Sequence, residues 1–452
     1  MSPTAVERLA QAPALQRLPR QLRDPFMLNN LVYFAGNFFA GLAGYAFQAL
    51  LARALGKDRY AEVASLIAIF YIVQILHFVA MAVAARITAP LATEGRQTEV
   101  QRAYRDMTLY ATFVGGAGMV IFLFVAPVLH ARLGIGLGPL VILSGTVPLS
   151  LLVGLGRGVL QGEQRFLPLS LNFVTYGTTT LLFLPILLAF RLHAVGATMA
   201  IILALTLCNL FAAVMLRDLP RGGHHTRLAL VGVVRGALAA GAGLTVITIF
   251  FNMDVILAKY FLPNSDAGLY SAMSLLGKIL FFGTISVSAV MFPRVAALHA
   301  QGKSAHSVVN ISLAAVLAAG MVVVAAYFLV PDLVIRLMLG AQYVQIGRNL
   351  GIYALAMLGL AIANVLVYYF VAVHRRRYMI VMGLGALLFF GGIATFHSDF
   401  SQFTVTVTVA INAMAVALLA MYLVEHPRRG RPDESVELPL ANMTAGAPGA
   451  GA

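Results

Sequence analysis

The feature that most constrains this chain is a series of twelve apolar runs, each of about 19 to 26 residues. An α-helix of that length crosses a hydrocarbon core roughly 30 Å thick, whereas the strands of a membrane β-barrel alternate over about ten residues. The runs lie at 28–52, 63–85, 107–129, 136–156, 167–190, 194–216, 236–261, 267–292, 307–330, 349–373, 378–396 and 401–424. We therefore expect an all-α, polytopic membrane protein with about twelve transmembrane helices.

Composition agrees with this class and excludes several others. Residues are 60% hydrophobic and only 11% charged, whereas about a quarter of a soluble globular domain is charged. The single cysteine, Cys208, excludes a disulfide framework and a cysteine metal site. No zincin, P-loop, nucleophile-elbow or paired-carboxylate motif is present. We expect no enzyme, no catalytic residues, no metal and no cofactor.

Lysine and arginine residues are distributed unevenly between the two sides of the predicted helices. The N-terminus, the even-numbered loops and the tail carry 21 of them, and the odd-numbered loops carry 8. By the positive-inside rule, both termini lie in the cytoplasm. The net charge of +14 therefore reflects topology and gives no reason to expect a nucleic-acid partner.

Short matches recur in the same order in the two halves of the chain. Leu51-Ala52-Arg53 aligns with Leu257-Ala258-Lys259, Gly95-Arg96 with Gly302-Lys303, and Gln164-Arg165-Phe166 with Arg376-Arg377-Tyr378. Six helices per repeat make the two repeats parallel. We predict a basic cytoplasmic N-terminus at 1–27, an N-lobe at 28–216, a cytoplasmic linker at 217–235, a C-lobe at 236–424 and a disordered cytoplasmic tail at 425–452.

Two charged residues fall deep within predicted spans. Asp254 and Lys278 lie roughly 12 and 17 Å from the interface at 1.5 Å per residue, where a charge costs about 2.5 to 3.5 kcal/mol. Lys278 could bind a phosphate or carboxylate of a ligand, or form a structural ion pair with Asp254. Asp254, with Asn252 nearby in sequence, could instead bind the H⁺ or Na⁺ that drives transport.

Further polar residues fall mainly on the first, second, seventh and eighth helices. Gln48 is the repeat equivalent of Asp254, and Asn37, Gln74 and His77 could line the same wet cavity or form interhelical hydrogen bonds. Arg157, flanked by glycines, could snorkel to the headgroups or bind a diphosphate.

Three segments resemble bacterial polysaccharide flippases. They are GRGVLQGEQRF at 156–166, NMDVILAKYFLPNSDAGLYSA at 252–272 and LVIRLMLGAQY at 333–343. These flippases belong to the superfamily of multidrug, oligosaccharidyl-lipid and polysaccharide exporters. The resemblance, over about 28–424, implies two six-helix lobes that rock around a cationic cavity, with Lys278 at a position suited to bind the substrate.

The resemblance thus implies a flippase that moves undecaprenyl-diphosphate-linked oligosaccharide across the bacterial cytoplasmic membrane by alternating access. The expected partners are this lipid-linked sugar, membrane lipids and polysaccharide assembly proteins. An ion-coupled multidrug antiporter of the same superfamily is the alternative, although a lysine in the cavity disfavours cationic drugs. A membrane-embedded sugar polymerase or ligase is a third reading, which the small outer loops disfavour.

Overall fold

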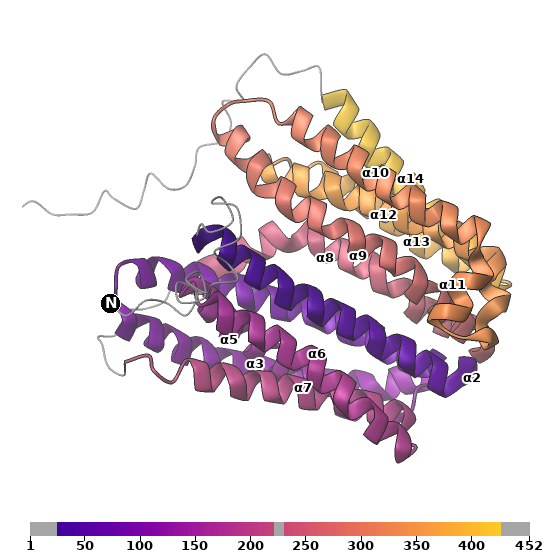
Figure 1. The fold of residues 1–452 in the computed structure, drawn as a ribbon, viewed down its shortest axis with the longest axis horizontal. Coiled ribbons are helices and arrows are strands. Elements are labelled where there is room, and N and C mark those ends of the chain that lie inside the picture. Colours follow the sequence, from indigo (N-terminus) through magenta and orange to yellow (C-terminus); the bar gives the residue numbers. More distant parts are fainter. Residues whose placement is uncertain (1–24, 221–229, 426–452) are drawn as a thin grey trace, which may run out of the picture.

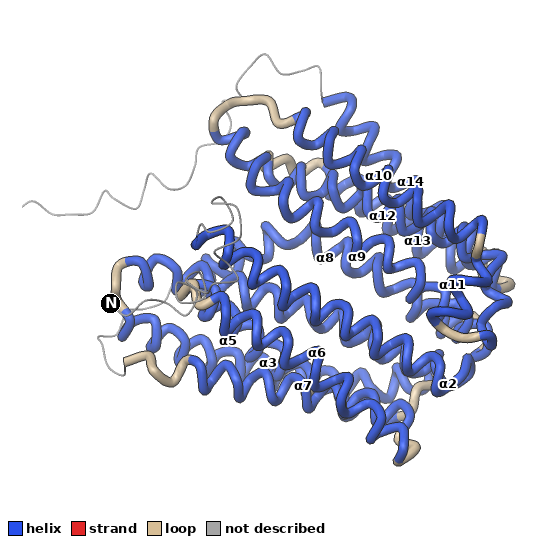
Figure 2. The backbone as a smooth tube through the Cα atoms, in the orientation of Figure 1, coloured by secondary structure: helices blue, strands red, loops and turns tan. Residues whose placement is uncertain are grey.

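The computed structural model describes residues 25–220 and 230–425, which are helical and contain no strand (Figures 1 and 2). Residues 1–24, 221–229 and 426–452 lie outside this description, and with them most of the predicted N-terminal segment, the middle of the linker and nearly all of the tail. The N-lobe helices are α2 (Pro25–Thr93), α3 (Gln97–Leu133), α4 (Leu137–Ser144), α5 (Thr146–Gly162), α6 (Phe166–Ala189) and α7 (His193–Met215). The C-lobe helices are α8 (Leu230–Phe261), α9 (Asn264–Ala300), α10 (His306–Leu329), α11 (Pro331–Met338), η3 (Ala341–Ile346), α12 (Gly347–Ala372), α13 (Tyr378–Thr395) and α14 (Phe400–Glu425).

The twelve predicted spans are confirmed in the described ranges. Ten helical segments there are long and apolar enough to cross a membrane. The first of them, α2, consists of two spanning helices joined at Gly56, whose φ of 71° and ψ of 171° are not helical. Counting α2 twice and adding α8, with its 32 residues, gives twelve spans.

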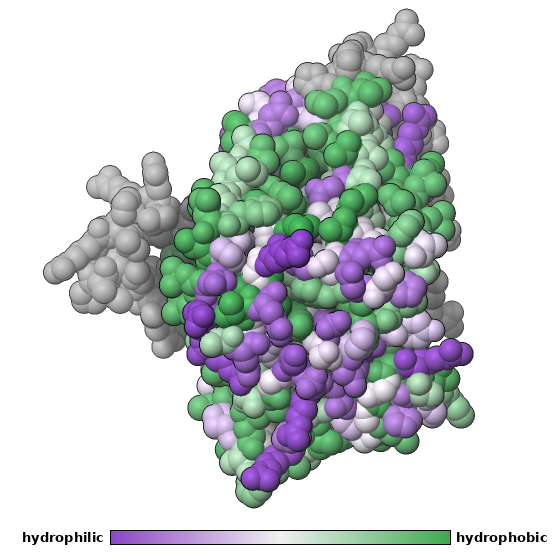
Figure 3. All heavy atoms as spheres, turned by 90° about the vertical axis from the view of Figure 1, so that its right-hand side faces the viewer, coloured by the Kyte–Doolittle hydropathy of each residue, from purple (hydrophilic) through white to green (hydrophobic). Residues whose placement is uncertain are grey.

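The helices form two lobes, one from α2 to α7 and the other from α8 to α14. In Figure 1 the lobes lie close together at the end where α11 is found and diverge toward the opposite end, where α2 begins and α14 ends. Figure 3 looks onto the α11 end and shows hydrophilic side chains gathered over its middle and lower part. This distribution suits an end that faces water.

The lobes repeat one another in their helix contacts. Asn209 on α7 donates a hydrogen bond from Nδ2 to the carbonyl oxygen of Leu149 on α5, at 3.2 Å. Asn412 on α14 donates from Nδ2 to the carbonyl oxygen of Leu355 on α12, also at 3.2 Å. The pairing of α5 with α7 is therefore reproduced by α12 with α14, and the two predicted parallel repeats are confirmed.

Two turns show how the repeats align. Gly95 and Gly302, matched in the sequence, both adopt left-handed backbone conformations, with φ of 73° and 68°. Arg165 and Arg377, also matched in the sequence, are the N-cap residues of α6 and α13, which begin at Phe166 and Tyr378. The left-handed residues that follow the preceding helices are Gln164, at φ 56°, and His374, at φ 54°. The connection before α13 is therefore two residues longer than the connection before α6.

Glycines allow α5 to pack tightly against the second half of α2. A Cβ atom at Gly154 would overlap the carbonyl oxygen of His77, and one at Gly158 would overlap that of Met81. Neither overlap is possible for a real side chain, so these positions require glycine in this packing. Small residues four apart are typical of closely packed membrane helices.

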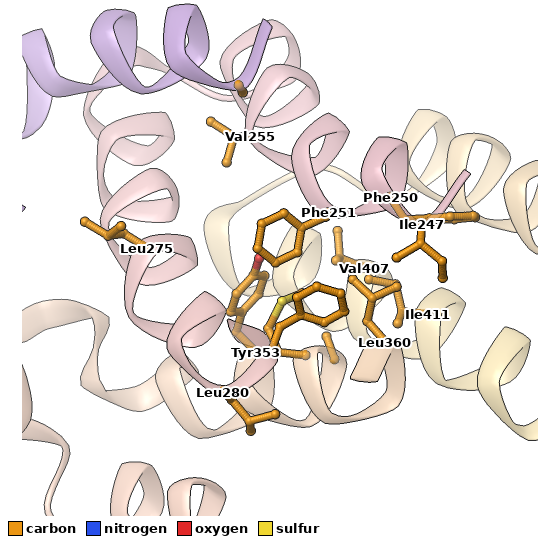
Figure 4. Packing of buried hydrophobic residues seen from close by; sticks show 14 of the residues in the cluster. Ile247, Phe250, Phe251, Val255, Leu275, Leu280, Tyr353, Leu360, Val407 and Ile411 are labelled. Carbon is orange, nitrogen blue, oxygen red and sulfur yellow. The ribbon is translucent and has the colours of Figure 1, made fainter. Parts of the chain in front are cut away.

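The C-lobe is built around α12, most of whose residues are buried. Aromatic and branched side chains of α8, α9, α12 and α14 pack together there, among them Phe250, Tyr353 and Ile411 (Figure 4). The outward faces are apolar as well, with Phe124 and Leu329 almost fully exposed. Such faces are expected where a protein meets lipid, since lipid chains are as apolar as the core.

Candidate functional site

Asp254 on α8 and Lys278 on α9 form a buried ion pair. Lys278 Nζ lies 3.5 Å from Asp254 Oδ1. The two helices are consecutive and turn back at Pro263, so the hairpin brings the two charges to the same level. The Asp254 side chain has no exposed surface, whereas that of Lys278 keeps 11%. Lys278 is therefore the member of the pair that a ligand could reach.

Three hydroxyl groups bind the second oxygen of Asp254. Oδ2 accepts hydrogen bonds from Tyr353 at 2.6 Å, from Tyr270 at 3.2 Å and from Ser274 at 3.2 Å. Oδ1 has no hydrogen-bond donor among the described residues and faces Lys278 instead. One oxygen is thus fully satisfied, and the other depends on the lysine or on a proton.

Lys278 lies at a narrow cavity between the lobes. Its Nζ also stands 4.8 Å from the centre of the Phe251 ring, a cation–π contact. The cavity measures about 20 Å³, enough for one water molecule. Its lining comes only from α2, α8 and α9, and its polar members are Gln48, Tyr60, Tyr71, Asn252, Ser271, Ser274 and Lys278.

Gln48 and Asn252, both predicted site residues, also line this cavity. Gln48 donates from Nε2 to the hydroxyl of Tyr71 at 3.3 Å, within the N-lobe. Asn252 donates to the carbonyl oxygen of Thr248 at 2.9 Å, one turn back on its own helix. Neither is hydrogen-bonded to Asp254, so the structure places them at the cavity but outside the ion pair.

Arg157 lies in the interior of the N-lobe, away from the cavity lining. Its Nε donates to Oδ1 of Asn172 at 2.7 Å, and its guanidinium stacks 3.9 Å from the centre of the Phe173 ring. The other contacts are with Cys208 Sγ at 3.8 Å and the Asn172 carbonyl at 3.5 Å. Among the described residues no carboxylate pairs with this buried cation. The Arg157 side chain therefore does not extend to the lipid headgroups, as snorkelling would require.

The remaining predicted site residues, all on α2, lie apart from the ion pair. His77 is buried, and its Nδ1 lies 3.3 Å from the carbonyl oxygen of Ser150. Gln74 is half-buried, and its Oε1 has no partner among the described residues. Asn37 is exposed near the start of α2. The structure does not bring these three residues to Lys278.

Sequence reasoning missed Tyr270, Ser274 and Tyr353. A signal existed for two of them, because Tyr270, Ser274 and Lys278 are spaced by four and so share one face of α9. Tyr353 belongs to α12, and nothing in the sequence indicates that its hydroxyl reaches Asp254. No group of three or more His, Cys, Asp or Glu side chains in the described ranges could hold a metal ion.

At the α11 end, hydrogen bonds join the lobes. Arg53 Nε donates to the carbonyl oxygen of Met338 at 3.0 Å, and its Nη2 donates to that of Leu337. The hydroxyl of Tyr343 on η3 donates to the Ala52 carbonyl at 2.9 Å. These contacts involve the last turn before Gly56, where α2 breaks. The short segment after α10, which holds α11 and η3, therefore closes this end.

No protein-family model matches the sequence, and no curated protein matches it. Solved structures do resemble it in fold. An inward-facing multidrug resistance MATE family transporter of the MOP superfamily matches with a TM-score of 0.73 and 12% identity, over 87% of this chain and 97% of that one. An outward-facing structure of such a transporter matches with a TM-score of 0.60 and 14% identity, over 88% of this chain and 95% of that one. A MOP superfamily transporter from Pyrococcus furiosus, described as having a binding pocket of reverse polarity, matches with a TM-score of 0.60 and 14% identity, over 87% of this chain and 94% of that one. The chain therefore has the two-lobed, twelve-helix fold of these transporters.

Proposed function

We propose that this protein is a flippase that moves an undecaprenyl-diphosphate-linked oligosaccharide across the bacterial cytoplasmic membrane. Lys278 binds the diphosphate in this proposal, and the lobes alternate access to it. Both termini are cytoplasmic, as the distribution of basic residues predicts. The protein carries out transport and no covalent chemistry, with membrane lipids and polysaccharide assembly proteins as its expected partners.

The observation that carries the proposal is the charge that the cavity presents. Lys278 is the one charged residue among the described residues that line the cavity, and its partner Asp254 lies outside that lining. The other buried cations, Arg157 in the N-lobe and Lys259 in the last turn of α8, do not line it. An ammonium group without a carboxylate beside it on the lining disfavours cationic drugs and attracts an anionic diphosphate.

The position of Lys278 supports the same reading. Its ammonium borders the cavity between the lobes, while its carboxylate partner is buried behind it. An ammonium group is a compact charge that binds phosphate readily. A diphosphate entering the cavity could replace the Asp254 carboxylate as the partner of Lys278.

The arrangement of the lobes supports alternating access. Their hydrogen bonds at Arg53 and Tyr343 close the α11 end, and the helices diverge toward the end where α2 begins (Figure 1). With cytoplasmic termini, this conformation is open to the inside. The higher TM-score of the inward-facing MATE structure, 0.73 against 0.60 for the outward-facing one, agrees with that assignment.

Asp254 suits a proton as the coupling ion better than Na⁺. Its Oδ1 lacks a hydrogen-bond donor among the described residues, and the ammonium of Lys278 already occupies the adjoining space at 3.5 Å. A sodium ion there would meet a positive charge at close range. A proton would neutralise Asp254 and release Lys278 to bind the diphosphate. Coupled proton transport also fits the alternative function, a multidrug antiporter, but the ammonium of Lys278 on the cavity lining disfavours cationic substrates.

The test is mass spectrometry of lipid-linked sugars in a strain that lacks this gene. Wild-type protein should prevent their accumulation on the inner leaflet, and the folded double variant Asp254→Asn with Lys278→Met should not. Lys303→Met, which removes an exposed lysine beyond the end of α9, is the matched control and should complement. Complementation by the double variant at wild-type level would remove Lys278 from substrate binding. Absence of any accumulated lipid-linked sugar in the deletion strain would contradict the flippase function itself.

A further inference from the structure

A second and larger cavity lies where α2 ends and α3 begins. Its volume is about 190 Å³, far above the 10–15 Å³ or so that one water molecule needs. Ile87, Pro90, Leu91 and Ala103 form an apolar wall, and the charged side chains of Arg96, Glu99, Arg102 and Asp106 form the rest of the lining. The cavity lies between the apolar run that ends at residue 85 and the one that begins at 107, where the predicted spans leave the hydrocarbon core and headgroups are expected.

One arginine of this cavity is already neutralised. Arg96 binds Glu99 through Nε and Nη2, both at 2.6 Å, and binds Glu94 through Nη1 at 2.7 Å. These hydrogen bonds, first those with Glu99, raise the pKa of the Arg96 guanidinium above its ordinary value. The three residues together carry a net charge of −1. The Arg96 guanidinium therefore has little remaining capacity to bind an anionic ligand.

Arg102 and Asp106, on the cavity side of α3, carry opposite charges but do not pair with each other. No hydrogen bond or ion pair joins either of them to a described residue, and Nη1 of Arg102 is buried without a partner. Arg four residues before Asp is also the less favourable order for a pair within a helix. One donor group and one acceptor group thus remain available on the same lining.

We propose that this cavity binds the headgroup of a zwitterionic aminophospholipid. Arg102 donates to the phosphate, and Asp106 accepts hydrogen bonds from the ammonium group. The acyl chains extend out of the cavity along the apolar wall and contact Ile87 and Leu91. A purely anionic headgroup suits the cavity less well, because the Glu94–Arg96–Glu99 cluster and Asp106 would repel it.

The test is native mass spectrometry of the full chain with phosphatidylethanolamine, phosphatidylglycerol and phosphatidylcholine of identical acyl chains. We expect phosphatidylethanolamine to be retained at least tenfold more tightly than either of the others. Arg102→Gln should lower that retention about tenfold. Asp106→Asn should reduce the preference over phosphatidylglycerol. Arg105→Gln, at an exposed position outside the lining, is the matched control and should change nothing.

Three outcomes would overturn the proposal. The first is equal retention of the three lipids by the wild-type protein, a result that does not depend on any variant folding. The second is an equal effect of Arg105→Gln and Arg102→Gln. Competition arms with inorganic phosphate and with phosphoethanolamine separate a free phosphate site from a lipid site. Displacement of the lipid by inorganic phosphate alone would contradict recognition of the ammonium group.

Discussion

Asp254→Asn should destabilise the protein more than Lys278→Met. Removing one member of a buried ion pair costs about 3–5 kcal/mol when the other charge is left without compensation. After Lys278→Met, the carboxylate keeps three hydroxyl donors, and hydrogen bonds to a charged group contribute about 1.5–3 kcal/mol each. After Asp254→Asn, the Lys278 ammonium keeps its cation–π contact with Phe251, worth about 0.5–2 kcal/mol, and the cavity that it borders. We therefore expect a loss of about 3–5 kcal/mol for Asp254→Asn and about 1–3 kcal/mol for Lys278→Met.

The assay is denaturant or thermal unfolding of the purified protein in detergent. The double variant should lie within about 1 kcal/mol of the wild type, because replacing a buried pair by neutral groups is often tolerated. The amide oxygen introduced at position 254 would still accept the hydroxyl donors, and the methionine introduced at position 278 would pack against Phe251. The reasoning is refuted if Lys278→Met proves at least as destabilising as Asp254→Asn, or if the double variant loses the sum of the two.

Three further predictions concern topology, helix packing and the closed end. Single cysteines at Ser304 and Asn264, both exposed positions, should react with membrane-impermeant reagents from opposite sides, Asn264 from outside; labelling from one side would contradict the topology. Gly268→Ala should lower the unfolding temperature, because its Cβ would overlap the backbone carbonyl oxygen of Lys57 on α2. Gly283→Ala on the same helix is the control, since its Cβ would meet nothing within 4 Å. Equal effects of the two variants on the unfolding temperature would refute this packing argument. Tyr343→Phe removes a hydrogen bond across the closed end, worth about 0.5–1.5 kcal/mol. Single-molecule fluorescence should therefore report a roughly two- to tenfold larger outward-open population. An unchanged population would show that this bond does not hold the end closed.

The spans and repeats could be predicted because the bilayer imposes them. Each backbone polar group within lipid must be satisfied inside its own helix, so apolar runs of spanning length map directly onto helices. The ends were less predictable, since α3 begins at Gln97 and α9 continues to Ala300, well beyond their apolar runs. These extensions carry charged residues that reach water, and hydropathy alone does not distinguish them from loops.

The candidate site could be predicted only in part. The cost of burying charge pointed to Asp254 and Lys278, and the hairpin of α8 and α9 brings them together. The hydroxyl of Tyr353 was not predictable, because its contact depends on how α12 is rotated against α8. His77 and Asn37 lie away from the pair for the same reason, since spacing along one helix does not determine which neighbour that face meets.

The central claim is that Lys278 receives the diphosphate of a lipid-linked sugar, and transport by purified protein in vesicles tests it most directly. A fluorescent undecaprenyl-diphosphate sugar in one leaflet should become accessible to an impermeant quencher when wild-type protein is present. Vesicles with the folded double variant of Asp254 and Lys278 should flip it no faster than protein-free vesicles. A lipophilic cation should not be moved by either protein. Flipping by the double variant at the wild-type rate, or transport of the cation in place of the sugar lipid, would contradict the account.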